Sequence, residues 1–207
     1  MRIAVLIFGR LNKCAEHYDN IVEKLGKYHT IDFYASSDNS LESIVNTFIS
    51  LYKPIAYDNS PVQYDYDLGK YPTREGVVTI IHNMTCHFIN KNRVWKLFEN
   101  YMHANNISYD VAVSMRLDLV FNNAFNFEHL LPNTIYIPIG SDHIINGIND
   151  QVAYGKLDVI KKYNSINVIE LLEQKLTIPH PESLTWANLH FHRINICRVN
   201  LLYVINR

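Results

Sequence analysis

The sequence lacks any long apolar run. Its N-terminal apolar stretch, Ile3 to Phe8, ends at Gly9-Arg10, which is too short for a signal peptide. No stretch approaches the roughly 20 apolar residues that a membrane-spanning helix needs. We therefore expect no signal peptide, no membrane span and a cytoplasmic location.

Cysteine is scarce. The chain has three, Cys14, Cys86 and Cys197, with long spacings and no C-x-x-C pair. This pattern argues against a disulfide framework or a zinc ribbon and favours a reducing compartment.

The chain also lacks an excess of positive or of negative charge. The formal net charge is -1 and only 19% of the residues are charged, so nothing predicts a nucleic-acid partner or an anionic membrane surface. With 207 residues, of which 48% are hydrophobic, the chain can bury the core of one domain, predicted to span residues 1–207.

The glycine-rich signatures of common nucleotide-binding proteins are missing. Neither G-x-G-x-x-G nor G-x-x-x-x-G-K-[ST] occurs, which argues against a dinucleotide-dependent dehydrogenase and a P-loop NTPase. A sheet that binds a nucleotide without such a loop must neutralise the phosphates by other means.

Apolar runs and helical periodicity predict an α/β fold with a mostly parallel central sheet of about six strands flanked by helices. Ser40 is the predicted N-cap of the second helix. The predicted strands cover residues 3–8, 31–35, 55–57, 109–115, 135–138 and 194–199, and the predicted helices cover 14–25, 40–53, 79–104, 156–163, 167–176 and 181–189.

Ligands of an open parallel sheet bind beyond the carboxyl ends of its strands. The residues predicted there are Phe8, Gly9, Arg10, Ser36, Ser37, Arg116, Leu117 and Asp118. These residue types suit a phosphorylated ligand that arrives with a hard cation such as Mg²⁺ or Mn²⁺.

Asp118 directly follows a buried strand and is the predicted metal ligand. The alternative is that Asp118 caps a turn or pairs with Arg116. The literal D-x-D of the chain, Asp65 to Asp67, lies in a polar loop without a strand to anchor it, so we rank it well below Asp118.

Lys91 falls on the otherwise apolar stripe of the long helix. A buried ammonium needs a partner. It either points at a diphosphate or pairs with a core carboxylate, and the sequence favours neither alternative. His87, one turn earlier, could contact the phosphorylated ligand, although a histidine on a helix face is more often structural.

Asp150 follows a loop that contains His143. A carboxylate beside a sugar could act as a general base on an acceptor hydroxyl, whereas an Asn-Asp pair could also cap a helix. His190 and His192 alternate and would share one face of a strand, so His190 could complete a metal site.

Several segments resemble small viral and bacterial glycosyltransferases of the GT-A fold, and among them the capsid-glycan glycosyltransferase domain of chlorella viruses. Residues 109–119 resemble the "YDvvi..R.DL" segment of that family, and residues 149–155 resemble its "NDQ.a.G" segment. The first strand and the Pro181-Glu182 helix start are also similar.

This resemblance implies a three-layer, Rossmann-like GT-A domain that binds a UDP-sugar with Mn²⁺ or Mg²⁺. Asp118 would hold the metal, and Asp150 would lie near the transferred sugar. Gly9, Arg10 and Ser37 would line the nucleotide. Arg74, His143, Asn149 and Gln151 are further predicted contacts of the nucleotide-sugar. Arg116 stands where a full D-x-D would have its first Asp, so the second metal ligand is open.

The sequence therefore predicts a metal-dependent transferase that moves a hexose from a UDP-sugar to a glycan or glycoprotein acceptor. Two alternatives stay open: a nucleotide- or carbohydrate-binding module without catalysis, and a nucleotidyltransferase. The latter usually needs paired carboxylates for two metals.

Overall fold

A seven-stranded sheet runs through the protein, in the strand order β3-β2-β1-β4-β7-β6-β8. The structure is a computed structural model, and it describes residues 1–64, 81–142, 147–174 and 177–206. All neighbouring strands pair in parallel except β7, which is antiparallel to both β4 and β6. The predicted mostly parallel α/β sheet is confirmed, with seven strands instead of about six.

Strands and helices alternate from β1 to β4, and β5, β6 and β7 then follow without an intervening helix. The strands are β1 Arg2–Phe8, β2 Thr30–Ser36, β3 Ala56–Asp58, β4 Val111–Met115, β5 Leu119–Phe121, β6 Thr134–Pro138, β7 Val152–Gly155, β8 Asn195–Val199 and β9 Tyr203–Ile205. The helices are α1 Cys14–Leu25, α2 Glu42–Tyr52, α3 Ile81–Asn105, α4 Leu157–Asn164, α5 Val168–Glu173 and α6 Pro181–Phe191.

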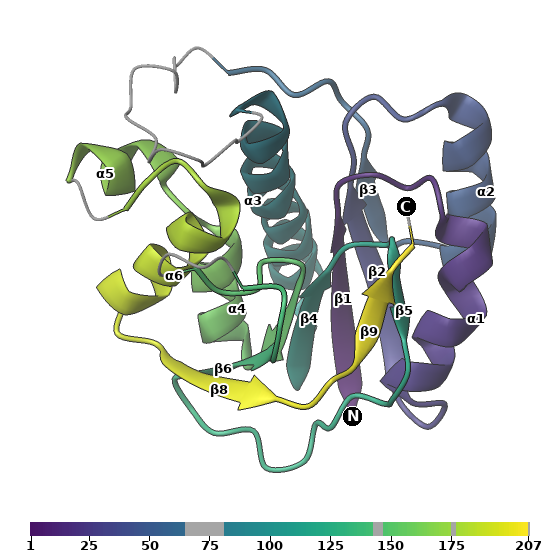
Figure 1. Ribbon diagram of the computed structural model, residues 1–207. Coiled ribbons are helices and arrows are strands. Elements are labelled where there is room, and N and C mark those ends of the chain that lie inside the picture. Colours follow the sequence, from purple (N-terminus) through teal and green to yellow (C-terminus); the bar gives the residue numbers. More distant parts are fainter. Residues whose placement is uncertain (65–80, 143–146, 175–176, 207) are drawn as a thin grey trace.

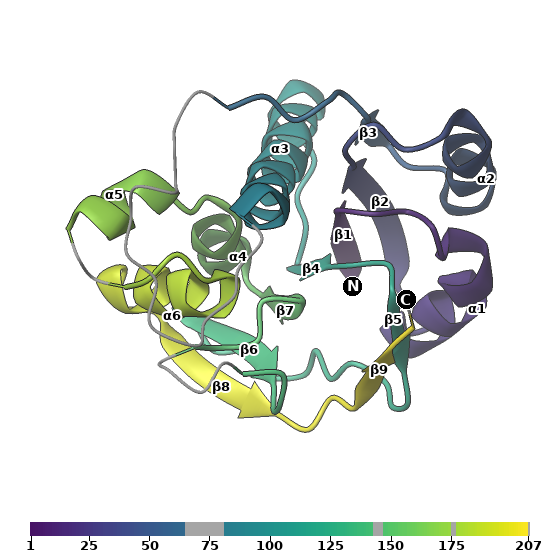
Figure 2. The same ribbon diagram turned by 45° about the horizontal axis from the view of Figure 1, so that its top comes forward.

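Helices cover both faces of the sheet and form the outer layers (Figure 1). Strand β1 is apolar throughout because both of its faces are covered. Its odd residues, such as Val5, pack on the side of α1 and α2. Its even residues, such as Leu6 and Phe8, pack on the side of α3 and α4. Viewed from another angle, α3 and α4 lie on the opposite side of the sheet from α1 and α2 (Figure 2).

Three strands, β5, β7 and β9, escaped the sequence prediction. Strand β7 has four residues and follows the 149–151 segment directly, so no turn signal marks it off. Strands β5 and β9 have three residues each and pair antiparallel with one another, next to the main sheet. All three are too short to show a clear alternation of apolar and polar residues.

The predicted N-cap of α2 is wrong. Leu41 occupies that position, and no side chain caps the helix. The backbone N–H of Ser40 instead donates to Asn59 Oδ1 at 2.7 Å, because the loop after β2 is tied to the residue that follows β3. Within the described part of the chain, no helix is long and apolar enough to cross a membrane.

Candidate functional site

The carboxyl ends of β1, β2 and β4 lie side by side. The register pairs Phe8 with Ser36 and Ile7 with Met115. Gly9 leaves β1 with a φ of +89°, a conformation that favours glycine, and its N–H donates to the Ser36 carbonyl at 3.0 Å. The predicted convergence of these strand ends is therefore observed, and the exposed Arg10 follows at the same edge.

The two serines at the end of β2 form hydrogen bonds to other side chains of the protein. Ser36 is buried and donates its hydroxyl to Asn90 Oδ1 on α3 at 2.7 Å. Ser37 is also buried and donates to Asn59 Oδ1 at 2.6 Å. These contacts join β2 to α3 and to the residues after β3, so the serines organise the edge.

Asp150 lies at the centre of a buried polar cluster. Its Oδ2 is 3.2 Å from His87 Nε2, and the two side chains are 7% and 13% exposed. This approach lacks the alignment of a hydrogen bond. The His87 ring packs edge-on against Phe8, with ring centroids 5.0 Å apart. Residues predicted from three separate segments thus meet at one place.

Lys91 is completely buried beside the same cluster. Its Nζ lies 3.4 Å from the centroid of the Tyr163 ring on α4 and 5.4 Å from that of Phe8. No described residue accepts a hydrogen bond from this Nζ. The negative charge of Asp150 raises the pKa of Lys91, against the effect of burial. No ion pair within 4.0 Å joins Lys91 to a described carboxylate, so neither predicted alternative for this lysine is decided.

Burial shifts the pKa of each member of the cluster. Burial raises the pKa of Asp150, and the charge of Glu182 adds to this effect, while Lys91 and Arg116 act in the opposite sense. Burial lowers the pKa of Lys91, which Asp150 partly offsets. Burial also lowers the pKa of His87 well below its usual value, with help from Lys91 and Arg116. His87 is therefore neutral near pH 7.

The flanking residues hold Asp150 in place. Asn149 Nδ2 donates to the Tyr203 hydroxyl at 2.6 Å, and that hydroxyl donates to Gln151 Oε1 at 3.0 Å. The Gln151 carbonyl accepts from Arg116 N–H at 3.1 Å. Asn149 and Gln151 thus bind β9 and the end of β4, while Asp150 between them contacts α3.

Arg116 and Asp118 form a two-pronged ion pair. Arg116 Nε donates to Asp118 Oδ1 at 2.9 Å, and a guanidinium NH₂ contacts Oδ2 more closely. The two side chains are 27% and 17% exposed. Leu117 between them is fully buried in the core, and its carbonyl contacts His17 Nδ1 at 2.6 Å. The alternative in which Asp118 pairs with Arg116 is therefore the arrangement observed.

Known structures resemble this one. LgtC, solved as an active-site mutant, matches with a TM-score of 0.53 and 11% identity over 96% of this chain and 72% of LgtC. The chain has the fold of the GT-A glycosyltransferases. A protein assigned as a nucleotide-diphospho-sugar transferase from Desulfovibrio desulfuricans matches with a TM-score of 0.45 and 12% identity, over 96% of this chain and 79% of that one.

The sequence itself matches no protein-family model and no curated protein. The predicted GT-A fold is thus supported through structure alone. The narrower resemblance to the chlorella virus domain gains no support from these comparisons.

The predicted pairing of His190 and His192 on a strand is wrong. Residue 190 lies in the last turn of α6 and residue 192 is the C-cap of that helix. Helix α6 begins at Pro181 and extends to Phe191, and strand β8 starts only at Asn195. Neither histidine therefore lies in a strand. The His190 ring is exposed and stacks on Trp186 at 3.9 Å.

The donor set around Asp118 does not fit Mn²⁺ or Mg²⁺ as it stands. Arg116 holds both of its carboxylate oxygens, and the described residues bring no second carboxylate into contact with it. A hard cation would have to displace the guanidinium. Three predicted elements, Arg74, His143 and the Asp65–Asp67 motif, lie outside the described residues.

Three other side chains could hold a metal ion. The potential ligand atoms of Asp38, His82 and Cys86 all lie within 4.8 Å of one another. Asp38 follows β2, and the other two residues lie in the first turns of α3. These residues form no C-x-x-C pair, so the sequence analysis did not identify them. A histidine and a cysteine four residues apart lie on the same face of a helix, and that spacing also allows both to bind one metal ion.

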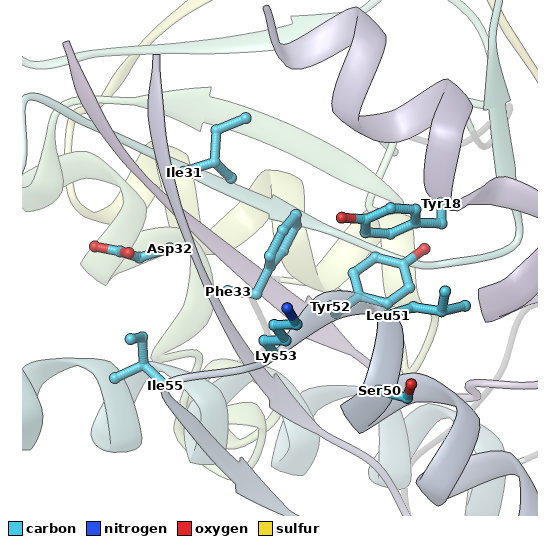
Figure 3. Close-up of a pocket in the computed structure, with 9 residues that line it drawn as sticks. All are labelled: Tyr18, Ile31, Asp32, Phe33, Ser50, Leu51, Tyr52, Lys53 and Ile55. Atoms are coloured by element: carbon cyan, nitrogen blue, oxygen red, sulfur yellow. The ribbon is translucent and has the colours of Figure 1, made fainter. Parts of the chain in front are cut away.

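A pocket of about 420 Å³ lies away from these groups, between β2, α1 and the end of α2 (Figure 3). Phe33 and Tyr52 of its lining belong to the core on the α1 and α2 side. The Asp150 cluster lies on the α3 and α4 side, with Phe8 and Tyr163. We therefore do not assign the pocket to the candidate site.

Sequence reasoning missed two tyrosines of the site. The Tyr163 ring lies against Lys91, and the Tyr203 hydroxyl bridges Asn149 and Gln151. The abundance of tyrosine, 14 residues, was the available signal. It does not distinguish a tyrosine of the site from one of the core.

Proposed function

We propose that this protein is a glycosyltransferase that moves a hexose from a UDP-sugar to a hydroxyl of a glycan or glycoprotein acceptor. The observation that carries the proposal is the cluster of Asp150, His87 and Lys91 at the carboxyl edge of the sheet. Buried titratable groups at such an edge are typical of functional sites. The GT-A fold supports the reaction class.

Asp150 is the proposed general base. Its buried carboxylate would accept the acceptor's hydroxyl proton while the acceptor oxygen bonds to the anomeric carbon. The bond from that carbon to the diphosphate oxygen breaks, and UDP leaves with the electron pair. Burial moves the pKa of Asp150 upward, toward the range in which a carboxylate is an effective base near neutral pH.

Arg116 is the proposed cation for the departing diphosphate. Its side chain is 27% exposed, its backbone N–H donates to the carbonyl of Gln151, the neighbour of Asp150, and its charge acts on Asp150. A guanidinium can bind phosphate oxygens with two parallel hydrogen bonds. Gly9, Arg10 and the main chain near Ser37 would line the nucleotide at the same edge.

Lys91 and His87 are proposed positioning residues. Lys91 is fully buried and its charge opposes the rise in the pKa of Asp150. Neutral His87 packs between Phe8 and Asp150. Together they would keep the carboxylate fixed and available for a proton.

A metal-dependent form of this reaction, with Mn²⁺ or Mg²⁺ on Asp118, requires that Asp118 release Arg116. Calorimetry of UDP binding with and without Mn²⁺ tests it. We expect similar affinities in both conditions, because a two-pronged, part-buried ion pair is costly to separate. We also expect Arg116→Gln to weaken UDP binding. Tighter binding in Mn²⁺ that disappears in Asp118→Asn would instead establish the metal on Asp118.

One observation favours a binding module without catalysis. Arg116 is ion-paired with Asp118, and Lys91 is buried. Both features are also expected of a site that binds a nucleotide-sugar without transferring the sugar. Such a protein would bind UDP-sugars and leave them intact during long incubation.

Turnover of the donor distinguishes these functions. We expect UDP release from at least one member of a panel of UDP-hexoses, faster with an oligosaccharide acceptor. Asp150→Asn should slow it by about 100-fold or more, the usual contribution of a general base. Asp158→Asn, an exposed substitution in the first turn of α4, is the control and should retain full activity.

A further inference from the structure

A second cluster of ligand-type side chains lies beside the candidate site. Asp38 follows Ser36-Ser37 in the loop after β2, and His82 and Cys86 lie one helical turn apart at the start of α3. The start of this helix lies at the carboxyl edge of the sheet (Figure 1). A carboxylate, an imidazole and a thiol thus approach one another from two elements.

The distances fit a shared metal ion. Cys86 Sγ lies 3.4 Å from Asp38 Oδ2 and 3.4 Å from His82 Nε2. In a tetrahedral zinc site, with Zn–S near 2.3 Å and Zn–N or Zn–O near 2.0–2.1 Å, ligand atoms lie about 3.5 Å apart. The two spacings from Cys86 match the edges of such a tetrahedron, and Asp38 and His82 lie within 4.8 Å of each other.

Hydrogen bonds orient the side chains of Asp38 and His82. In each, one polar atom bonds a neighbouring residue, and the other polar atom faces Cys86. Asp38 Oδ1 accepts from the Val62 N–H at 2.8 Å, so Oδ2 is the oxygen that faces Cys86. His82 Nδ1 contacts the Tyr64 hydroxyl at 3.1 Å, so Nε2 is the nearer nitrogen to Cys86. Contacts of this kind orient the ligands of metal sites and tune their affinity.

We propose that Asp38, His82 and Cys86 bind a zinc-class divalent cation. A thiolate and an imidazole select Zn²⁺ over the hard cations Mg²⁺ and Mn²⁺. Cys86 binds as the thiolate, and its proton passes to solvent when the metal enters. Three protein ligands leave a fourth position for water or a ligand oxygen.

This site does not depend on the proposed transferase activity. It would tie the loop after β2 to the first turns of α3, and so fix the helix that carries His87 and Lys91. A metal-free alternative exists for the same contacts. The thiol would donate to Asp38 and accept from a protonated His82 Nε2, which leaves the three residues linked by hydrogen bonds only.

Cobalt titration of the metal-free full-length protein tests the proposal. Co²⁺ should give the intense thiolate-to-cobalt charge-transfer absorption and the visible bands of tetrahedral coordination, and added Zn²⁺ should displace both. Mg²⁺ in excess should not. Cys86→Ser should abolish the charge-transfer band, while Cys197→Ser, which replaces another half-buried free thiol, should retain it.

A second variant guards against loss of folding. His82 is exposed, so His82→Asn should fold, as circular dichroism can verify, and should bind Co²⁺ at least about tenfold more weakly. The proposal is overturned if Co²⁺ gives no thiolate band, or if the band survives in Cys86→Ser. Because the readout is spectroscopic, a protein that binds Co²⁺ but releases no UDP would support this site and contradict the transferase.

Discussion

Lys91 is completely buried, and no described residue accepts a hydrogen bond from its ammonium group. Burying a charge is costly unless it is paired and hydrogen-bonded, and Asp150 compensates only in part. An apolar residue would suit the helix stripe better. A buried lysine near a buried carboxylate at the edge of the sheet is typical of a functional site.

The pair should reduce stability while supporting activity. We expect the double variant Lys91→Met/Asp150→Asn to be at least as stable as the native protein, because it removes two buried charges together. It should release no UDP. Asp150→Asn alone should be less stable than the double variant, because it leaves Lys91 buried without its counter-charge.

The stability of Asp150→Asn should change with pH in a defined direction. In Asp150→Asn the pKa of Lys91 falls further below its usual 10.5, because the charge of Asp150 that raises it is gone. Between the folded and unfolded pKa values the unfolded chain binds more protons. Stability therefore rises with pH, by up to about 1.4 kcal/mol per pH unit, and the charge costs most below the folded pKa.

Urea unfolding of Asp150→Asn and of the double variant at pH 7, 8 and 9 measures this effect. The difference between the two should shrink as the pH rises. A difference that stays constant would mean that Lys91 is solvated and keeps its usual pKa.

The sequence identified the members of this cluster one by one. Asp150, Lys91 and His87 were each singled out by a motif or by a polar residue on an apolar stripe. Their mutual contacts could not be predicted, because they depend on the packing of α3 against the segment before β7. The same limit left two alternatives open for Asp118, and its pairing with Arg116 became visible only in the structure.

At the scale of elements, the short strands β7 and β9 position the candidate base. Strand β7 begins directly after Gln151 and pairs antiparallel with β4, Val152 opposite Met115. Strand β9 brings the Tyr203 hydroxyl to Asn149 and Gln151. The 149–151 segment is thus held on both sides, and Asp150 projects from it toward α3.

Removing the Tyr203 hydroxyl should loosen this segment. Tyr203→Phe removes the hydrogen bond to Gln151 Oε1 and leaves Asn149 Nδ2 with only the Gly140 carbonyl, at 3.2 Å. The loss should lower the free energy of unfolding by about 1–3 kcal/mol. If Tyr203 positions Asp150, kcat for donor turnover should fall while the donor KM changes little.

The matched control is Tyr28→Phe, since Tyr28 is 98% exposed and should change neither stability nor turnover. An equal loss of activity through KM alone in Tyr203→Phe would indicate a role in holding the donor instead.

Periodicity predicted the long elements well and the short ones poorly. Strand β1 and helix α3 were found because many residues repeat one pattern. Strands β7 and β9 have four and three residues, and their place comes from pairing with distant strands. A strand defined by its partners leaves little trace in its own sequence.

At the scale of the whole molecule, the order β3-β2-β1-β4 brings the ends of β1, β2 and β4 to one edge, and the first turns of α3 lie over it. Alternating β and α segments were enough to predict this edge, because parallel strands joined by helices all point the same way. The side on which the chemistry lies, that of α3 and α4, required the structure. The proposed zinc-class site and the Asp150 cluster are both built on the start of α3.

We propose that this edge of the sheet transfers a sugar with Asp150 as the base. The most direct measurement is UDP release from a panel of UDP-hexoses, with and without an oligosaccharide acceptor, by the native protein, Asp150→Asn and Asp158→Asn. We expect turnover in the native protein and in Asp158→Asn, and a loss of about 100-fold or more in Asp150→Asn. Intact donor in every case, or equal turnover by Asp150→Asn, would contradict it.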